Sequence, residues 1–228
     1  MSRPIFIAGS RGVGKTTTAN IISNLLECVE GSQKKREHIN FADALKLELA
    51  TYIYELHRYY HVVDPGGLTW HHKAIESMPG LDTTLLQFTY GKSIDDMVWE
   101  MNMSSVKEVY RRFMQWYGTD YRRKQFSDSW WTDKFVEAVA KVNNRTITSD
   151  MRFSNEYEVG ESLKGIFVLV RSDLEQSNPE HESEDLSIWK DRHFDLTIIN
   201  TRIPGDTTFT KLTRTIFDNL SIFTDTRL

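Results

Sequence analysis

The chain has 228 residues, of which 39% are hydrophobic and 12% aromatic, enough for one well-packed domain with an inserted subdomain. The formal net charge of −4 gives no reason to expect a polyanionic partner. Any anion binding must therefore come from local clusters such as Arg111-Arg112 and Arg122-Arg123-Lys124. The single cysteine, Cys28, excludes an intrachain disulfide and fits a reducing compartment.

The sequence also lacks the apolar runs of a membrane protein. No segment combines the length and the hydrophobicity of a membrane span, and the first residues carry no signal-like pattern. We therefore expect a soluble, cytoplasmic protein with neither a membrane nor a nucleic-acid partner.

The first predicted elements alternate between strand and helix. Residues 4–8 predict a short strand, and apolar residues at helical spacing from Ala19 to Val29 predict a helix that Gly31 can end. A brief strand over 38–42 and a helical run over about 43–58 follow. This order is typical of a parallel α/β sheet.

The second part of the chain begins with a stretch that is hard to interpret. Residues 61–104 contain Pro-Gly turn signals, and we expect an irregular, partly helical insertion there. Helices are predicted over about 106–117 and from Ser127 or Asp128 to about Val139. Strands are predicted over 145–149, 165–170 and 195–199, and a closing helix over 209–220.

A phosphate-binding motif follows the first strand. Gly9-x-x-x-x-Gly14-Lys15-Thr16 matches the P-loop pattern in full. The glycines let backbone N–H groups turn toward phosphate oxygens, and the following helix points its positive dipole end at them. Lys15 would lie between the β- and γ-phosphates, and the Thr16 hydroxyl would ligate Mg²⁺. The motif predicts binding of a nucleoside triphosphate.

Three classes of protein could use such a loop. A GTPase switch would need NKxD, which is absent, although Asp64-Pro-Gly-Gly67 formally matches DxxG. A nucleic-acid-dependent ATPase would carry Asp-Glu after an apolar strand, and the nearest candidate, Thr146-Ile-Thr-Ser-Asp150, lacks the Glu. A small-molecule kinase fits the chain length best, and it needs a second anion site for its acceptor.

Such a site is suggested by two polar residues on the helix predicted over 106–117. Arg111 and Gln115 are four residues apart and face the same side, offering a guanidinium for a phosphate and an amide for a base. Taken alone, the pattern fits an ordinary amphipathic helix with solvated arginines equally well.

The wider pattern resembles a known family. Arg111-Arg112-x-x-Gln115-x-x-Gly118-Thr119-Asp120, followed by Trp130-Trp131, is similar to the bacteriophage deoxynucleoside monophosphate kinases. Other stretches match that family in order and spacing: Phe41-Ala-Asp-Ala-Leu-Lys46, Asp150-Met-Arg152-Phe-Ser-Asn-Glu156, Arg171, His181-x-Ser183-Glu184 and Asn200. The resemblance implies a three-layer P-loop nucleoside triphosphate hydrolase fold. It implies one domain over 1–228, with an inserted helical acceptor-binding region at 43–130 and a lid at 172–190.

The resemblance also implies roles for individual residues. ATP would be held by Gly9, Arg11, Gly12, Val13, Gly14, Lys15, Thr16, Thr17 and Asn200. The acceptor would be held by Phe41, Lys46, Arg111, Arg112, Gln115, Gly118, Thr119, Trp131, Asp150, Arg152 and Glu156. Catalysis would rest on Lys15, Arg111, Asp150, Arg152 and Arg171, and Mg²⁺ on Thr16 or Thr17 with Asp150. Within these sets, Gln115 and Trp131 would meet the base, and Glu156 would orient Arg152 or touch the sugar.

The activity implied is ATP- and Mg²⁺-dependent transfer of the γ-phosphate to deoxynucleoside monophosphates, giving the diphosphates, in the host cytoplasm if the protein is of phage origin. The partners would be small-molecule nucleotides. Alternatives are a kinase of another small acceptor, such as dephospho-coenzyme A or a nucleoside, and a non-kinase nucleotide-dependent regulatory protein. Because residues 56–104 match nothing in the family, base preference is left open. So is the oligomeric state, with a homodimer among the options.

Overall fold

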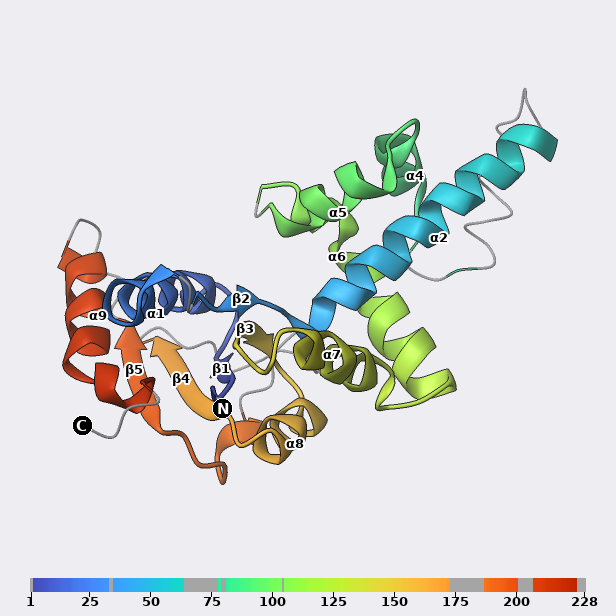
Figure 1. Cartoon of the computed structure of the whole chain (residues 1–228). Helices are drawn as coiled ribbons and strands as arrows, with labels where there is room; N and C mark the ends of the chain where they lie inside the picture. The colour runs from blue at the N-terminus through green and yellow to red at the C-terminus, as the bar shows by residue number, and fades with distance from the viewer. Residues whose placement is uncertain are drawn as a thin grey trace. The chain divides into compact units, whose positions relative to one another are not determined.

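A computed structural model describes residues 2–32, 35–63, 78, 81–103, 105–172, 187–200 and 207–224 (Figure 1). The chain forms two compact units. The first unit contains residues 1–41 and 132–228, and the second contains residues 42–131. The second unit covers nearly the same residues as the insertion expected at 43–130, whose acceptor-binding role stays a prediction.

The first unit is built on a five-stranded sheet in which every pairing is parallel. The strand order is β2-β3-β1-β4-β5, which places β1 in the centre. Their bounds are β1 (Ile5–Ala8), β2 (Glu37–His38), β3 (Thr146–Met151), β4 (Ile166–Ser172) and β5 (Leu196–Asn200). This sheet confirms the α/β class expected from the alternating pattern.

Helices cover both faces of the sheet and give it three layers (Figure 1). Side chains of a strand alternate between its two faces. Ile5 and Ile7 accordingly share a core with α1 (Lys15–Glu30) and α9 (Thr207–Asp218), whereas Phe6 shares the opposite core with α7 (Trp130–Lys141) and α8 (Ser154–Ser162). Two short 3-10 helices, η4 (Ser187–Trp189) and η5 (Leu220–Ile222), complete this unit.

The second unit is helical. The elements described there are α2 (Phe41–Val63), α4 (Thr83–Thr89), α5 (Ile94–Asn102), α6 (Lys107–Gln115) and η2 (Trp116–Arg123). Its apolar core includes Leu49 from α2, Met97 from α5 and Phe113 from α6, all fully buried. Helix α6 runs directly into η2, which is a π-helix. The helix predicted over 106–117 therefore changes its hydrogen-bonding pattern after Gln115.

One predicted strand is shorter than expected. The sequence pattern predicts a strand over 38–42, but β2 ends at His38 and α2 begins at Phe41. Beyond this point, hydrogen bonds from side chains take the place of strand pairing between β2 and β3. Asn40 Oδ1 accepts the backbone N–H of Ser149 at 2.9 Å, and Asp150 Oδ1 accepts that of Phe41 at 3.0 Å. A carboxylate that accepts the N–H of the first helical residue favours a helix start over a continued strand.

The remaining differences concern the extent of elements, one helix that was not predicted, and one segment outside the described residues. Helices α4 and α5 occupy part of the stretch expected to be irregular, and α8 was not predicted. The lid expected at 172–190 falls largely on residues 173–186, which lie outside the described part of the chain.

Gly160 provides a test of the packing between α8 and the sheet. A Cβ added there would lie 2.7 Å from the Phe167 ring and 3.2 Å from the Phe6 ring. We expect Gly160→Ala to lower the free energy of unfolding by about 1–3 kcal/mol, because the clash outweighs a gain in helix propensity of roughly 1 kcal/mol. Urea unfolding measures this, with the exposed Glu161→Ala as control. A variant as stable as the wild type would contradict the packing.

Candidate active site

The P-loop begins at the carboxyl end of β1. Gly9 has a φ of +145°, and a Cβ added there would lie 2.2 Å from the carbonyl oxygen of Val170 on β4. No side chain fits at that distance, so the first glycine of the motif lets the loop pass directly over the neighbouring strand. The loop is therefore anchored to the centre of the sheet.

The Lys15 ammonium is held within this loop. Its Nζ donates to the carbonyl oxygens of Gly9 at 2.8 Å and Ser10 at 2.7 Å, and the residue is only 8% exposed. The backbone oxygens therefore hold a buried positive charge at the loop. A positive charge fixed in advance in this way can stabilise the negative charge of a phosphate.

The end of β5 also contacts the P-loop. Asn200 Nδ2 donates to the carbonyl oxygen of Val13 at 2.7 Å, and it would lie 2.8 Å from a Cβ added to Gly14, whose φ is +99°. Asn200 Oδ1 is buried and has no hydrogen-bond partner among the described residues. An acceptor of this kind suits an amino group of a nucleotide base, so this side of the loop fits a donor nucleotide.

Side-chain oxygens of the kind that Mg²⁺ binds lie on α1 and β3, near the carboxyl end of β1. Thr16 and Thr17 are exposed in the first turn of α1, and Asp150 on β3 directly precedes Met151, which pairs with Ala8 of β1. The described residues contain no group of three or more His, Cys, Asp or Glu side chains able to hold a metal. Mg²⁺ usually needs only one or two carboxylates besides phosphates and water, so these oxygens fit it.

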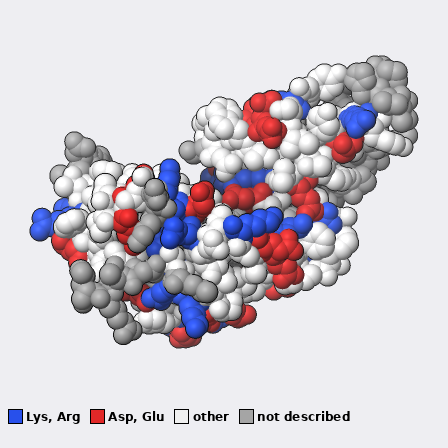
Figure 2. Space-filling view, viewed as in Figure 1, with Lys and Arg blue, Asp and Glu red and all other residues white. Residues whose placement is uncertain are grey.

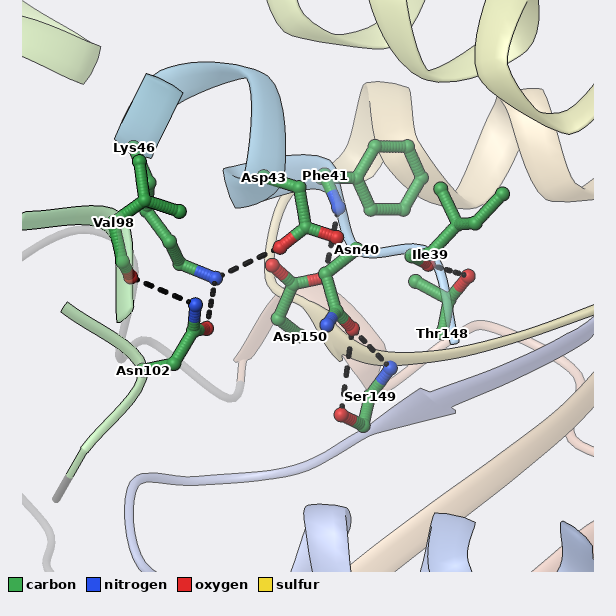
Figure 3. Close-up of polar contacts among 10 residues, drawn as sticks. All are labelled: Ile39, Asn40, Phe41, Asp43, Lys46, Val98, Asn102, Thr148, Ser149 and Asp150. Atoms are coloured by element: carbon green, nitrogen blue, oxygen red, sulfur yellow. Dashed lines mark hydrogen bonds and ion pairs between the residues drawn. The ribbon is translucent and has the colours of Figure 1, made fainter. Parts of the chain in front are cut away.

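Asp150 is held by the chain segment after β2 (Figure 3). Its Oδ1 accepts the Phe41 N–H. The two preceding residues of β3 are also hydrogen-bonded to this segment. The Ser149 N–H donates to Asn40 Oδ1, and Thr148 Oγ1 donates to the carbonyl oxygen of Ile39 at 2.7 Å. These bonds extend the contact between β2 and β3 beyond the strand. They fix the direction of the carboxylate.

Phe41 itself lies in the apolar core of the first unit. Its ring is 3% exposed and stacks on Phe135, with 4.0 Å between the ring centroids. Its predicted contact with the acceptor stays a prediction, and the contact observed is with the core.

Glu156 holds the backbone next to Arg152. Its carboxylate is buried, and its Oε2 accepts the backbone N–H groups of Arg152 at 2.6 Å and Phe153 at 3.1 Å. The glutamate therefore closes the start of α8 and fixes the backbone from which the Arg152 side chain projects. Arg171 lies exposed on β4, opposite Ile199. The roles predicted for both arginines at the transferring phosphate stay predictions.

Within the second unit, Arg111 pairs with an acid that the sequence reasoning did not assign. Its Nε and Nη2 donate to the two carboxylate oxygens of Glu108 at 2.8 and 2.9 Å. Gln115 lies one turn further on and is half-buried, whereas Arg112 is exposed. Arg111 and Gln115 thus lie on one helix, as the spacing predicts, and their contacts with an acceptor stay predictions.

Lys46 is a buried cation between two helices of the same unit (Figure 3). Its Nζ donates to Asp43 Oδ1 and to Asn102 Oδ1, each at 2.8 Å, and Asn102 Nδ2 donates to the Val98 carbonyl at 2.9 Å. The ammonium therefore joins the first turns of α2 to the end of α5. Asn102 carried no signal in the sequence, because it lies 56 residues from its partner in a stretch without family motifs.

Trp131 is part of the helical core. It is 3% exposed, and its Nε1 donates to the carbonyl oxygen of Gly118 at 2.9 Å. A Cβ added to Gly118 would lie 3.0 Å from Leu45, so α2 packs closely on η2 at this glycine. Thr119 is also buried. Stacking of a base on Trp131, which stays a prediction, would require the ring to become exposed.

Two buried tyrosines of this unit donate to carboxylates. The O–H of Tyr110 donates to Glu100, and that of Tyr117 to Glu48. Burial raises the pKa of both tyrosines far above the ordinary value, and the nearby carboxylates raise it further. Both hydroxyls therefore remain protonated donors at neutral pH.

Comparison with known proteins adds the family. A family model described as deoxynucleotide monophosphate kinase matches residues 29–203, more than half of the chain. The chain belongs to this family. It is therefore a phosphotransferase of the deoxynucleotide monophosphate kinase class, and the P-loop lies just before the matched stretch. A search of curated proteins found no match.

The surface of this kinase carries both signs of charge. On the face shown in Figure 2, Lys and Arg side chains are interspersed with Asp and Glu side chains. Among the helices that the structure describes, none has the length and apolar character needed to cross a membrane.

The tyrosine contacts predict a loss of stability at high pH. Unfolded tyrosines ionise near pH 10, whereas folded Tyr110 and Tyr117 keep their protons to higher pH. Above about pH 10 the folded state binds more protons, so the free energy of unfolding falls as pH rises, by roughly 1.4 kcal/mol per pH unit for each tyrosine. Urea unfolding at about pH 9 and pH 11 measures this. Tyr110→Phe should reduce the fall in the free energy of unfolding between these pH values, whereas the change Tyr90→Phe at an exposed tyrosine should not. An equal fall in both variants would contradict the raised pKa of Tyr110.

Proposed function

We propose that this kinase transfers the γ-phosphate of ATP to a deoxynucleoside monophosphate. An oxygen of the acceptor's phosphate forms a bond to the γ-phosphorus, the bond from that phosphorus to the β–γ bridging oxygen breaks, and ADP leaves. The observation that carries the proposal is the Lys15 ammonium, held by P-loop carbonyls at the carboxyl end of the central strand. The family match supports a deoxynucleoside monophosphate as the acceptor.

On the donor side, the chain would bind and orient the triphosphate. Backbone N–H groups of the loop and the amino-terminal end of α1 favour phosphate oxygens, and Lys15 adds a fixed positive charge. Asn200 Oδ1, buried beside the loop without a described partner, supports recognition of the donor's base. Thr16 or Thr17 with Asp150 would hold Mg²⁺, which when bound would neutralise charge on the phosphates.

On the acceptor side, Arg111 is the main candidate for binding the monophosphate. Glu108 engages the Nε–Nη2 edge of its guanidinium, and this bidentate contact orients the plane of the group. A guanidinium held in one plane loses less side-chain entropy when it binds a phosphate. Gln115, on the same helix, is a candidate for the base.

A coupled assay of ADP formation tests the proposal, with ATP, Mg²⁺ and each of the four deoxynucleoside monophosphates in turn. We expect turnover with at least one monophosphate and little hydrolysis without it.

We expect Lys15→Met to lower kcat by about a hundredfold or more, because a charge aligned with the transition state is lost. No ADP formation by the wild type with any monophosphate would overturn the proposal.

Replacing Arg111 separates acceptor binding from donor binding. We expect Arg111→Ala to raise the KM for the monophosphate by roughly ten- to a hundredfold, the effect of losing hydrogen bonds to a charged group, and to leave the KM for ATP nearly unchanged. Steady-state kinetics with each substrate varied measures both. The control is Arg58→Ala on α2, which removes an exposed arginine with the same i,i+3 pairing, to Glu55. Equal increases in both KM values would show that Arg111 acts on folding instead.

A further inference from the structure

Residues 111–120, here called the acceptor motif because the acceptor contacts are predicted there, include an unusual segment of backbone. Gly118, Thr119 and Asp120 lie in the π-helix η2, directly after Gln115 at the end of α6. Longer π-helical runs are rare, because their hydrogen bonds span five residues instead of four, and π-bulges are often found at functional sites. A segment of this kind needs contacts from its surroundings to keep its shape.

Glu48 of α2 supplies several of these contacts. Its Oε1 accepts the O–H of Tyr117 at 3.0 Å and forms an ion pair with Arg122, so both ends of η2 are bonded to one carboxylate oxygen. Its Oε2 accepts the indole N–H of Trp130, at the start of α7, at 3.3 Å. Arg122 Nη2 also donates to the Tyr117 hydroxyl at 2.9 Å, which closes the network.

The Arg122 guanidinium lies among aromatic rings. Its central carbon is 4.8–5.2 Å from four ring centroids, those of Tyr117, Tyr121, Phe126 and Trp130. The side chains of Arg122 and Glu48 are 18% and 22% exposed. Ring faces stabilise a cation that has lost most of its water, but they cannot replace the counter-charge. Removing the Glu48 charge would leave a largely buried cation without its acid partner.

The basic run 122–124 is therefore not arranged as an anion-binding cluster. Each of the three cations forms an ion pair. Arg122 pairs with Glu48, Arg123 Nη1 lies 3.7 Å from Asp128 Oδ1, and Lys124 Nζ lies 2.7 Å from Asp120 Oδ1. Each of the three cations has an acidic neighbour within the second unit. The contacts indicate a structural role for this run, unlike that proposed for Arg111.

We propose that Glu48 is a positioning residue for the acceptor site. By binding Tyr117 and Arg122 at the two ends of η2, it holds the π-helical segment and sets the positions of Gln115 and Thr119 on the acceptor motif. Gly118 allows α2 to approach closely enough for this contact. The inference rests on the proposed function, since it assigns an effect on acceptor binding.

The test is the variant Glu48→Gln, which keeps the size and the acceptor oxygen of the side chain but removes its charge. We expect the KM for the accepted monophosphate to rise by about tenfold or more, with the KM for ATP unchanged, because displaced binding groups lose their hydrogen bonds to the acceptor. Glu55→Gln is the matched control on the same helix, where Glu55 forms an exposed ion pair with Arg58. Calorimetric titration of the monophosphate without ATP should show the same loss of affinity.

An effect confined to folding would look different. It would lower the active fraction, and hence the apparent kcat, at an unchanged KM, and that result would overturn the inference. If Glu48→Gln does not fold, Tyr117→Phe decides by the same criteria, because it removes only one hydroxyl of the network. A wild-type protein that neither binds nor phosphorylates any monophosphate would contradict the proposed function. An active wild type with an unchanged acceptor KM in the variant would contradict only the role of Glu48.

Discussion

The position of the P-loop depends on the burial of β1 between two parallel neighbours. All four residues of β1 are fully buried, and the strand pairs with β3 on one side and β4 on the other. A buried strand cannot move without breaking hydrogen bonds on both sides, so its end is a fixed point. Gly9, at that end, lies against Val170 of β4, and Asp150 directly precedes Met151, the β3 partner of Ala8. The sheet therefore holds in fixed positions the residues that are predicted to contact phosphate.

The two units hold their buried charges in different ways. In the first, Lys15 is bonded by backbone carbonyls and Glu156 by backbone N–H groups, so the loops themselves orient the charges. In the second, Lys46 is paired with Asp43 of its own helix and bonded to Asn102 of α5, and Arg122 is paired with Glu48 of the neighbouring helix α2. A buried charge is costly unless hydrogen bonds compensate it, so each contact also restrains the segment that makes it. The contacts of Lys46 and Arg122 join helices, whereas those of Lys15 and Glu156 fix a charge against the backbone of its own segment.

Much of the first unit could be predicted from local patterns. The predicted strands at residues 4–8, 145–149, 165–170 and 195–199 agree with β1, β3, β4 and β5 to within two residues at each end. Buried strands of a parallel sheet appear in the sequence as short apolar runs, and such runs predict strands without knowledge of the tertiary structure. Helix α8 gave no clear signal, since its start depends on Glu156 and its middle contains Gly160, which the packing on Phe167 requires.

The sequence by itself determined the P-loop, the α/β order of the elements and the helical spacing of Arg111 and Gln115, because each depends on residues close together in the chain. Only the tertiary structure decided which polar groups meet between distant elements. Glu48 meets Trp130 across 82 residues, and no spacing within one helix could reveal that contact. The helix predicted to continue to Tyr117 becomes a π-helix for the same reason. Its shape depends on the carboxylate, the rings and the close approach of α2, all of which exist only once the helices have packed.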